Sequence, residues 1–264
     1  MTKAITTKNA ALDLLRDSYE VEARPQKISL PRLTFVSQDQ TEGKGKARKV
    51  TVEAGTFFTE TKTDEVDKET GKNIWERTEL GLKIEGVIIY QRKQLSHYDE
   101  ASGQYTSSPI YDSNDDVVPL FRGGQKIDSG TPQELKGRDE YQGTTAKGKP
   151  TSNLKENKVL YIIYEDDVYQ MNIKGSSLYS FQAYARTGIT IPAVITAFNS
   201  EPKENGAIEW NQMTFKATAD LPSKKVVEIA QQVVDIRDTI QAEKAQYSDD
   251  SKAEIDPKEA AKGF

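Results

Sequence analysis

Alternating apolar and polar positions mark the middle of the chain. The longest such stretch covers residues 80–92, where Leu80, Leu82 and Ile84 alternate with small or charged residues. A period of two predicts a half-buried β-strand. Gly86 interrupts this pattern, and a glycine inside a strand often marks a bend. A strand that bends there can serve two sets of neighbours, as a β-barrel requires.

A second alternating region predicts a β-hairpin. The sequence KVLYIIYEDDVYQMNIK, residues 158–174, contains two strand-like runs around Glu165–Asp167. Apolar and polar residues alternate in the second run, which is typical of a strand with one buried face. The following LYSFQAYAR segment predicts a short helix, with Ser176 or Ser177 as its N-cap.

The remaining β candidates are shorter, and long polar segments separate them. The strands are predicted over residues 26–36, 50–58, 189–198 and 207–219. The charged segment TETKTDEVDKETGKN, residues 59–73, is predicted to form a long hairpin loop. The stretches 99–116 and 122–158 are expected to be mostly loops because of their Gly, Ser, Asn and Asp content.

Helical spacing is confined to the two ends of the chain. Residues 8–18 predict a short helix, and residues 223–241 predict a longer amphipathic one. The apolar stripe of the longer helix consists of Val226, Ile229, Ala230, Val233, Ile236 and Ile240. The expected organisation is an N-terminal helical arm (1–25), a β-rich domain (26–221), a C-terminal helix (222–246) and a disordered acidic tail (247–264).

Composition excludes several classes of chemistry. The 264 residues include no cysteine and one histidine, His97, so disulfide frameworks, cysteine nucleophiles and multi-histidine metal sites are excluded. Glycine-rich phosphate loops and the common hydrolase and kinase motifs are absent. No signal peptide and no apolar run of the ~20 residues needed to span a membrane is present. We therefore expect a non-enzymatic protein of the cytoplasm that uses no cofactor and does not enter a membrane.

Two acidic clusters keep a metal-dependent nuclease open as an alternative. Asp112, Asp115 and Asp116 share one predicted loop, and the acids 165–167 share a predicted turn. Carboxylates of a two-metal site must converge on ions ~3.5–4 Å apart. Consecutive acids in a turn point to different sides, so turn formation is the simpler interpretation. His97 is interpreted as a surface or hydrogen-bonded side chain.

Aromatic residues on strands, together with lysine-rich loops, favour nucleic-acid binding. Single strands are held by a cationic groove in which bases stack on aromatic rings. Tyr90, Tyr164 and Trp210 are the stacking candidates, because each shares its strand face with polar or cationic residues. The candidate phosphate contacts are Lys44, Lys46, Arg48 and Lys49 in one loop, Lys147, Lys149 and Lys158 in another, and Arg92 and Lys216 on predicted strands.

Three features together resemble phage or mobile-element single-stranded-DNA-binding proteins. They are the β-rich body with basic loops, the segment KVLYIIYEDDVYQMNIKGSSLYSF, and the mildly acidic tail ending in Phe264. The resemblance implies an OB-like antiparallel β-barrel that binds single-stranded DNA, or alternatively RNA, in a bacterium or a phage-infected cell. It also implies that the tail, through Phe264, recruits replication or recombination proteins. A protein-interaction or viral assembly module is the main alternative.

Overall fold

The computed structural model describes residues 30–42, 49–66, 73–99, 101–145, 148–230 and 232–233. All of them fall within one contact-defined unit, Leu30–Thr239. The prediction of a mainly β chain is confirmed, since strands outnumber the few short helices among these residues. The predicted N-terminal helix and acidic tail lie outside the described residues, as do five of the predicted site residues: Lys44, Lys46, Arg48, Lys147 and Phe264.

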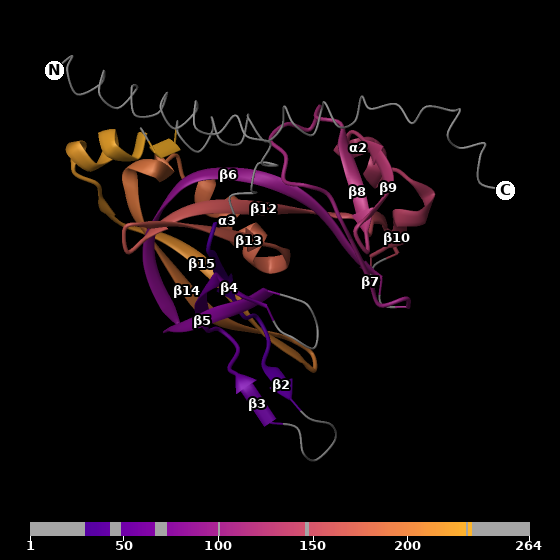
Figure 1. The fold of residues 1–264 in the computed structure, drawn as a ribbon, viewed down its shortest axis with the longest axis horizontal. Coiled ribbons are helices and arrows are strands. Elements are labelled where there is room, and N and C mark those ends of the chain that lie inside the picture. Colours follow the sequence, from indigo (N-terminus) through magenta and orange to yellow (C-terminus); the bar gives the residue numbers. More distant parts are fainter. Residues whose placement is uncertain are drawn as a thin grey trace. The chain divides into compact units, whose positions relative to one another are not determined.

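The long strand β6 (Lys83–Asp99) has a different neighbour at each end. Its first residues, 83–86, pair with β14 (Val194–Asn205), whereas later residues pair with β12 (Lys155–Tyr164). Gly86 lies where the pairing changes, and a Cβ there would come within 2.7 Å of the Ile163 carbonyl oxygen. The glycine is therefore required by the close approach of β12. The strand serves two sets of neighbours, as its sequence predicts, and it visibly curves (Figure 1).

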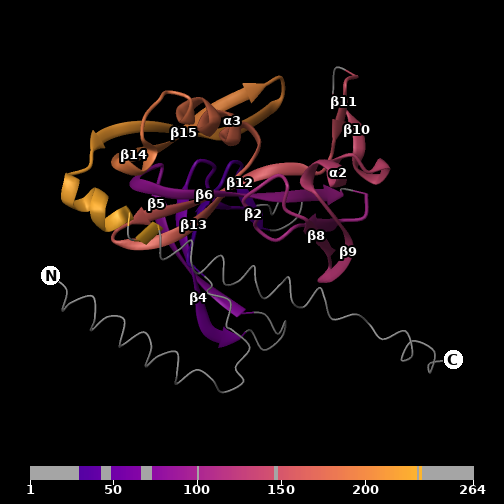
Figure 2. The same ribbon diagram turned by 90° about the horizontal axis from the view of Figure 1, so that it is seen from above.

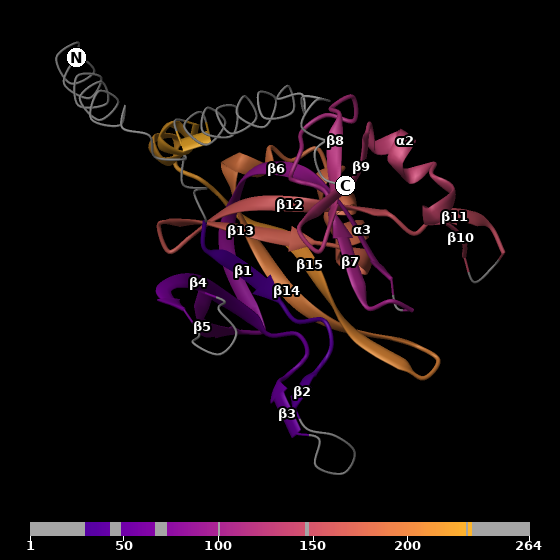
Figure 3. The same ribbon diagram turned by 45° about the vertical axis from the view of Figure 1, so that its right-hand side comes forward.

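Eleven strands form one mixed sheet, in which nine follow the order β5-β4-β1-β13-β12-β6-β7-β8-β9 and the β14–β15 pair joins through β6. Figure 3 shows β6, β12, β13 and β1 side by side. The other members are β1 (Arg32–Phe35), β4 (Phe57–Val66), β5 (Asn73–Gly81), β7 (Gln104–Ser107), β8 (Val118–Arg122), β9 (Gln125–Gly130), β13 (Asp167–Ile173) and β15 (Ile208–Asp220). A separate small sheet pairs β2 (Gln40–Glu42) with β3 (Lys49–Val52).

The sheet does not close into the antiparallel barrel that was expected. Strand β1 runs parallel to β13 and occupies the edge of β13 that faces away from β12. β15 pairs only with β14 in the sheet. The chain after β1 still reaches β15, because the Asn211 amide donates to the Ser37 carbonyl over 2.7 Å. Strand β1 thus occupies the edge of β13 that would have to pair with β15 to complete a barrel.

The β12–β13 hairpin confirms the hairpin prediction. Its register runs from Lys158 opposite Ile173 to Tyr164 opposite Asp167. The two turn residues, Glu165 and Asp166, have φ values of 48° and 70°. Positive φ at both central positions is the signature of the type I′ turn, whose twist matches that of paired strands.

The prediction of a long hairpin loop over residues 59–73 is wrong. Most of this charged segment is strand, because β4 extends to Val66 and β5 begins at Asn73. β5 is the terminal strand of the sheet order, and its polar side chains remain exposed or half-buried. A strand at a sheet edge buries little apolar surface, so it lacks the hydrophobic alternation by which strands are recognised.

Helix α3 (Gly175–Ala185) is present, but its predicted caps are not used as caps. Its N-cap residue is Lys174, which makes no side-chain cap. Ser177 Oγ instead accepts a hydrogen bond from the Met213 amide at 3.0 Å, and Ser176 Oγ accepts from Trp210 Nε1 at 3.0 Å. The two serines therefore attach α3 to β15, and Figure 2 shows this helix beside that strand.

Two hydrophobic cores stabilise the described unit. The larger lies between α3 and the strands β1, β4, β6, β12, β13, β14 and β15, and it includes Leu33, Phe57, Ile88, Leu160, Ile162, Met171, Phe181 and Phe198. The smaller contains Leu95, Tyr111, Val118, Leu120, Leu135, Tyr141 and Leu154. It forms where mostly loop was predicted, around α2 (Pro132–Lys136), a 3-10 turn (Asp139–Tyr141) and the pair β10 (Gln142–Thr144) and β11 (Pro150–Ser152).

The predicted C-terminal helix is described only in its first turns. Residues 223–230 and 232–233 are helical. Its apolar residues Val226, Ile229, Ala230 and Val233 line a pocket of about 270 Å³, together with Ile89, Thr190, Pro192 and Ala193. Among the described helices, none is long and apolar enough to cross a membrane.

Candidate nucleic-acid interface

One register row crosses six strands of the sheet. Its members occupy directly opposite positions on neighbouring strands, and such residues share a face. From β6 to β5 they are Tyr90, Tyr161, Gln170, Arg32, Glu60 and Arg77. We call this set the aromatic–cationic row. Its two arginines are exposed, Tyr90, Gln170 and Glu60 are half-buried, and Tyr161 is buried.

Trp75 and Lys62 extend the row by one step. They pair with each other, and each lies two residues from a row member on its own strand, so both project from the same face. The Arg32 guanidinium carbon lies 4.4 Å from the centroid of the Trp75 ring, which is a cation–π distance. Trp75 is half-buried and Lys62 is exposed. An aromatic ring, an arginine and a lysine therefore meet at the β4–β5 end of this face.

Arg77 is fixed by an ion pair and a ring. It donates from Nε (3.0 Å) and Nη2 to Glu60 Oε1, and its guanidinium carbon lies 5.1 Å from the Phe58 ring centroid. Glu60 also accepts from the Thr34 hydroxyl at 3.2 Å. Glu60 is the single carboxylate among the six row members, so the row carries a net positive charge.

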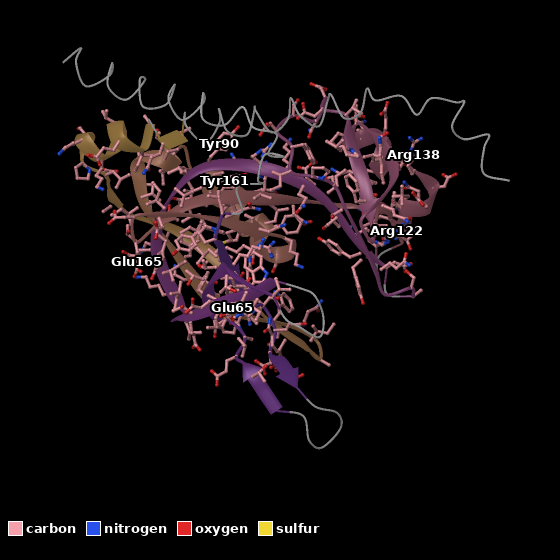
Figure 4. All side chains as sticks on the ribbon, viewed as in Figure 1. Glu65, Tyr90, Arg122, Arg138, Tyr161 and Glu165 are labelled. Atoms are coloured by element: carbon pink, nitrogen blue, oxygen red, sulfur yellow. The ribbon has the colours of Figure 1, made fainter. Side chains whose placement is uncertain are left out.

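Tyr90 and Arg92 converge on one carboxylate at the other end of the row. Arg92 Nε donates to Asp112 Oδ1 at 2.8 Å, and the Tyr90 hydroxyl donates to the same oxygen at 3.3 Å. The Tyr90 and Tyr161 rings lie 5.9 Å apart (Figure 4). Burial by itself would lower the pKa of Arg92, but hydrogen bonds to Tyr161 and Asp112 raise it. Arg92 is only 5% exposed, so its charge is held inside the structure.

Three predicted site residues lie away from this row. Trp210 is half-buried on β15 and bonded to Ser176, whereas Lys216 is exposed further along the same strand. Tyr164 lies at the edge of the larger core, with its ring 6.0 Å from that of Tyr169. Burial raises the pKa of Tyr164, which stays protonated.

The described basic residues of the two predicted loops are also dispersed. Lys149 is exposed beside the β10–β11 turn, where its amide donates to the Thr145 hydroxyl. Lys49 begins β3. Lys158 lies on β12 opposite Lys93, one residue along from the Arg92–Val159 pair, and therefore on the opposite sheet face from Arg92. Of the predicted residues, the structure brings together Tyr90 and Arg92.

Sequence reasoning missed most of the row. Arg32, Gln170 and Trp75 come from three strands, and no sequence spacing relates them. The available signal was Trp75 within NIWERTELG, where Glu76 and Arg77 directly follow the tryptophan. The charged segment 59–73 before it was predicted as a loop, and residues 74–79 were not predicted as a strand.

The acidic clusters and His97 have structural partners. Asp116 Oδ2 accepts from the amides of Asp112 and Ser113, which is turn chemistry. The His97 ring lies 5.8 Å from the Tyr141 ring in an edge-on arrangement. Within the described part of the chain, no group of three or more His, Cys, Asp or Glu side chains could hold a metal ion.

No protein-family model, no curated protein and no solved structure matches this chain. The resemblance to single-stranded-DNA-binding proteins therefore depends on the sequence features alone.

Proposed function

We propose that this protein binds single-stranded DNA without catalysing a reaction, and that the strand lies along the aromatic–cationic row. The observation that carries the proposal is the junction of Trp75, Arg32 and Lys62 on one face, where Arg32 is in register with Tyr90 across the sheet. Single-strand binders combine cations that follow the backbone with rings on which bases stack. Both groups are present on this face, and neither requires a base-specific contact.

The strand connections support an OB-type unit within the larger sheet. The unit consists of five strands in chain order, β6, β12, β13, β14 and β15, with β7 to β11 inserted between the first two. The long first strand pairs with both the second and the fourth. Helix α3 lies between the third and the fourth strand. OB-folds bind oligonucleotides on the face of their second and third strands. In this unit those are β12 and β13, which contribute Tyr161 and Gln170 to the row.

In this arrangement each end of the row has a distinct task. At the β5 end, Trp75 stacks on a base while Arg32 and Lys62 neutralise neighbouring phosphates. At the β6 end, Tyr90 offers a second ring, which is positioned by its contact with the Tyr161 ring on the neighbouring strand and by its hydrogen bond to Asp112. Arg92 orients this end rather than touching phosphate, because it is buried in an ion pair.

The decisive experiment is Trp75→Ala, assayed by fluorescence anisotropy with a labelled oligo-dT. We expect a loss of about 1–3 kcal/mol in binding free energy, the usual value of one base–aromatic stack. Trp75→Phe, which keeps a ring, should retain most of the affinity. Lys62→Gln should lower the slope of log K against log salt by about 0.7, the value for one phosphate on a single strand.

Trp210→Ala is the matched comparison, because Trp210 is also half-buried on a strand but bonded to α3. If Trp210→Ala weakens oligo-dT binding and Trp75→Ala does not, the strand follows β15 and the row is not the interface. If wild-type protein fails to bind oligo-dT even at low salt, the proposed function is wrong. Urea unfolding of each variant separates a binding defect from a folding defect.

A further inference from the structure

Two lysines face each other on the sheet side opposite the aromatic–cationic row. Lys158 of β12 lies directly opposite Lys93 of β6, and both side chains are half-buried. Like charges in directly opposite positions destabilise a pair of strands. Burial, and next the charge of Lys93, lower the pKa of Lys158. The sheet therefore holds a pair of like charges at a half-buried position.

The surrounding residues neutralise this pair only in part. The only carboxylate among the groups that shift the pKa of Lys158 is Glu156. It already accepts from Lys136 Nζ at 3.1 Å and from the Tyr111 hydroxyl at 3.2 Å. Lys93 Nζ donates to a neutral partner, Asn114 Oδ1, at 2.7 Å. Lys158 has no side-chain hydrogen bond or ion pair with the described residues. Three ammonium groups therefore share one carboxylate.

The site is framed by fixed groups. Lys93 is held on both backbone atoms by Tyr111, with N···O distances of 2.9 and 2.8 Å. Lys136 belongs to α2, whose start is fixed by a capping box between Thr131 and Glu134. An anion entering here would meet preplaced cations, whose mutual repulsion it would relieve. Such relief adds to the direct attraction, because binding then also lowers the energy of the protein.

We propose that Lys93, Lys158 and Lys136 form a phosphate-binding site, separate from the aromatic–cationic row. The ligand is a phosphate group, supplied either by a phosphodiester of a bound nucleic acid or by a free phosphate. Two lysines supply charge toward the ligand, and the third is shared with Glu156. This site does not depend on the proposed function, because free phosphate alone can occupy it.

The test measures thermal unfolding of the full chain in phosphate against chloride buffer at equal ionic strength. Wild-type protein should gain about 3 °C more from phosphate than Lys158→Gln or Lys93→Gln, as expected for a ligand present at about five times its dissociation constant. The matched control is Lys155→Gln, on the same strand but the opposite face, where Nζ donates to Thr151. It should respond like wild type, which accounts for the general stabilising action of phosphate. Equal responses of wild type and Lys158→Gln would overturn the proposal.

Oligo-dT titrations in different salt concentrations separate the two sources. A salt slope that falls by about 0.7 in Lys158→Gln identifies a phosphodiester as the occupant. An unchanged slope, together with a lost phosphate response, identifies a free phosphate. Trp75→Ala should leave the phosphate response intact, so a failure of the row as a DNA interface and a failure of this site give different results.

Discussion

The two faces of the β6–β12 strand pair treat a cation differently, as Arg92 on one face and Lys158 on the other show. Val159 and Arg92 are opposite partners, and one residue along Lys158 and Lys93 are opposite partners, so the two cations project to different sides. Arg92 is almost completely buried, yet it has Asp112 and the Ile110 carbonyl as partners. Lys158 is more exposed, yet its directly opposite partner on the neighbouring strand is another lysine.

Burial alone therefore does not identify a functional cation. A buried charge with a complete set of partners stabilises its surroundings only as long as those partners remain. A half-buried charge with a like-charged neighbour costs stability in the absence of a ligand. The first arrangement, around Arg92, stabilises the fold. The second, around Lys158, is the basis of the proposed phosphate site. The two cations should therefore respond in opposite directions when their charge balance is altered.

The largest effect should come from Asp112→Asn, which leaves the Arg92 guanidinium buried without its carboxylate. We expect a loss of about 2–3 kcal/mol in the free energy of unfolding, below the usual cost of a fully buried pair because Asp112 is partly exposed. Urea denaturation measures it. The double variant Arg92→Met, Asp112→Asn should recover at least half of the loss, because no uncompensated charge remains. A loss below about 0.5 kcal/mol in the single variant would show that the pair is not structural.

Lys158→Met should change stability in the opposite direction. Methionine keeps the apolar stem and removes the repulsion, so the free energy of unfolding should rise by about 0.5–1 kcal/mol at pH 7. Because the folded pKa of Lys158 is lowered, the unfolded chain binds more protons between the folded and unfolded pKa values. Wild-type stability therefore rises with pH across that window. The advantage of Lys158→Met should shrink as the pH approaches the unfolded pKa, and an advantage that grows with pH would contradict the repulsion.

The smallest expected effect concerns the charge of the aromatic–cationic row. Glu60→Gln removes the single carboxylate of the six members and should tighten oligo-dT binding by about threefold, near the value of one exposed charge pair. Glu76→Gln is the matched control. Glu76 pairs with Thr61, one residue along from the Glu60–Arg77 pair, and therefore faces the side of the sheet opposite the row. Equal gains in both variants would reflect net charge rather than position on the face.

The elements that the sequence predicted correctly are those that bury one face in the larger core. Met171 and Ile173 are buried while Asn172 between them is exposed, so the hydrophobic alternation of β13 reports its environment directly. Gly86 was identifiable for a similar reason, because close backbone contact excludes a side chain there. Strand β5 and the charged part of β4 gave no such signal, since β5 is the terminal strand of the sheet order and charged strands resemble loops in sequence.

The candidate site was less accessible to sequence reasoning than the fold. Tyr90 and Arg92 were identified together because they are two residues apart on one strand, and the structure joins both to Asp112. Trp75 and Arg32 are neighbours only because β1 and β5 both flank β4. The prediction of a closed barrel was wrong for the same reason, because the pairing of β1 with β13 joins segments far apart in the chain.

Hydrophobic periodicity predicted the strands that bury one face in the larger core and the turn of the β12–β13 hairpin, and composition excluded cysteine and multi-histidine chemistry. Those features depend on the order of neighbouring residues and on the chemical inventory of the chain, which can be read without the fold. The alignment of one aromatic and cationic row across six strands, and the pairing of Lys93 with Lys158 on the reverse side, follow only from the tertiary structure. Strand register creates the row and the lysine pair, and register is set by the packing of residues far apart in the chain.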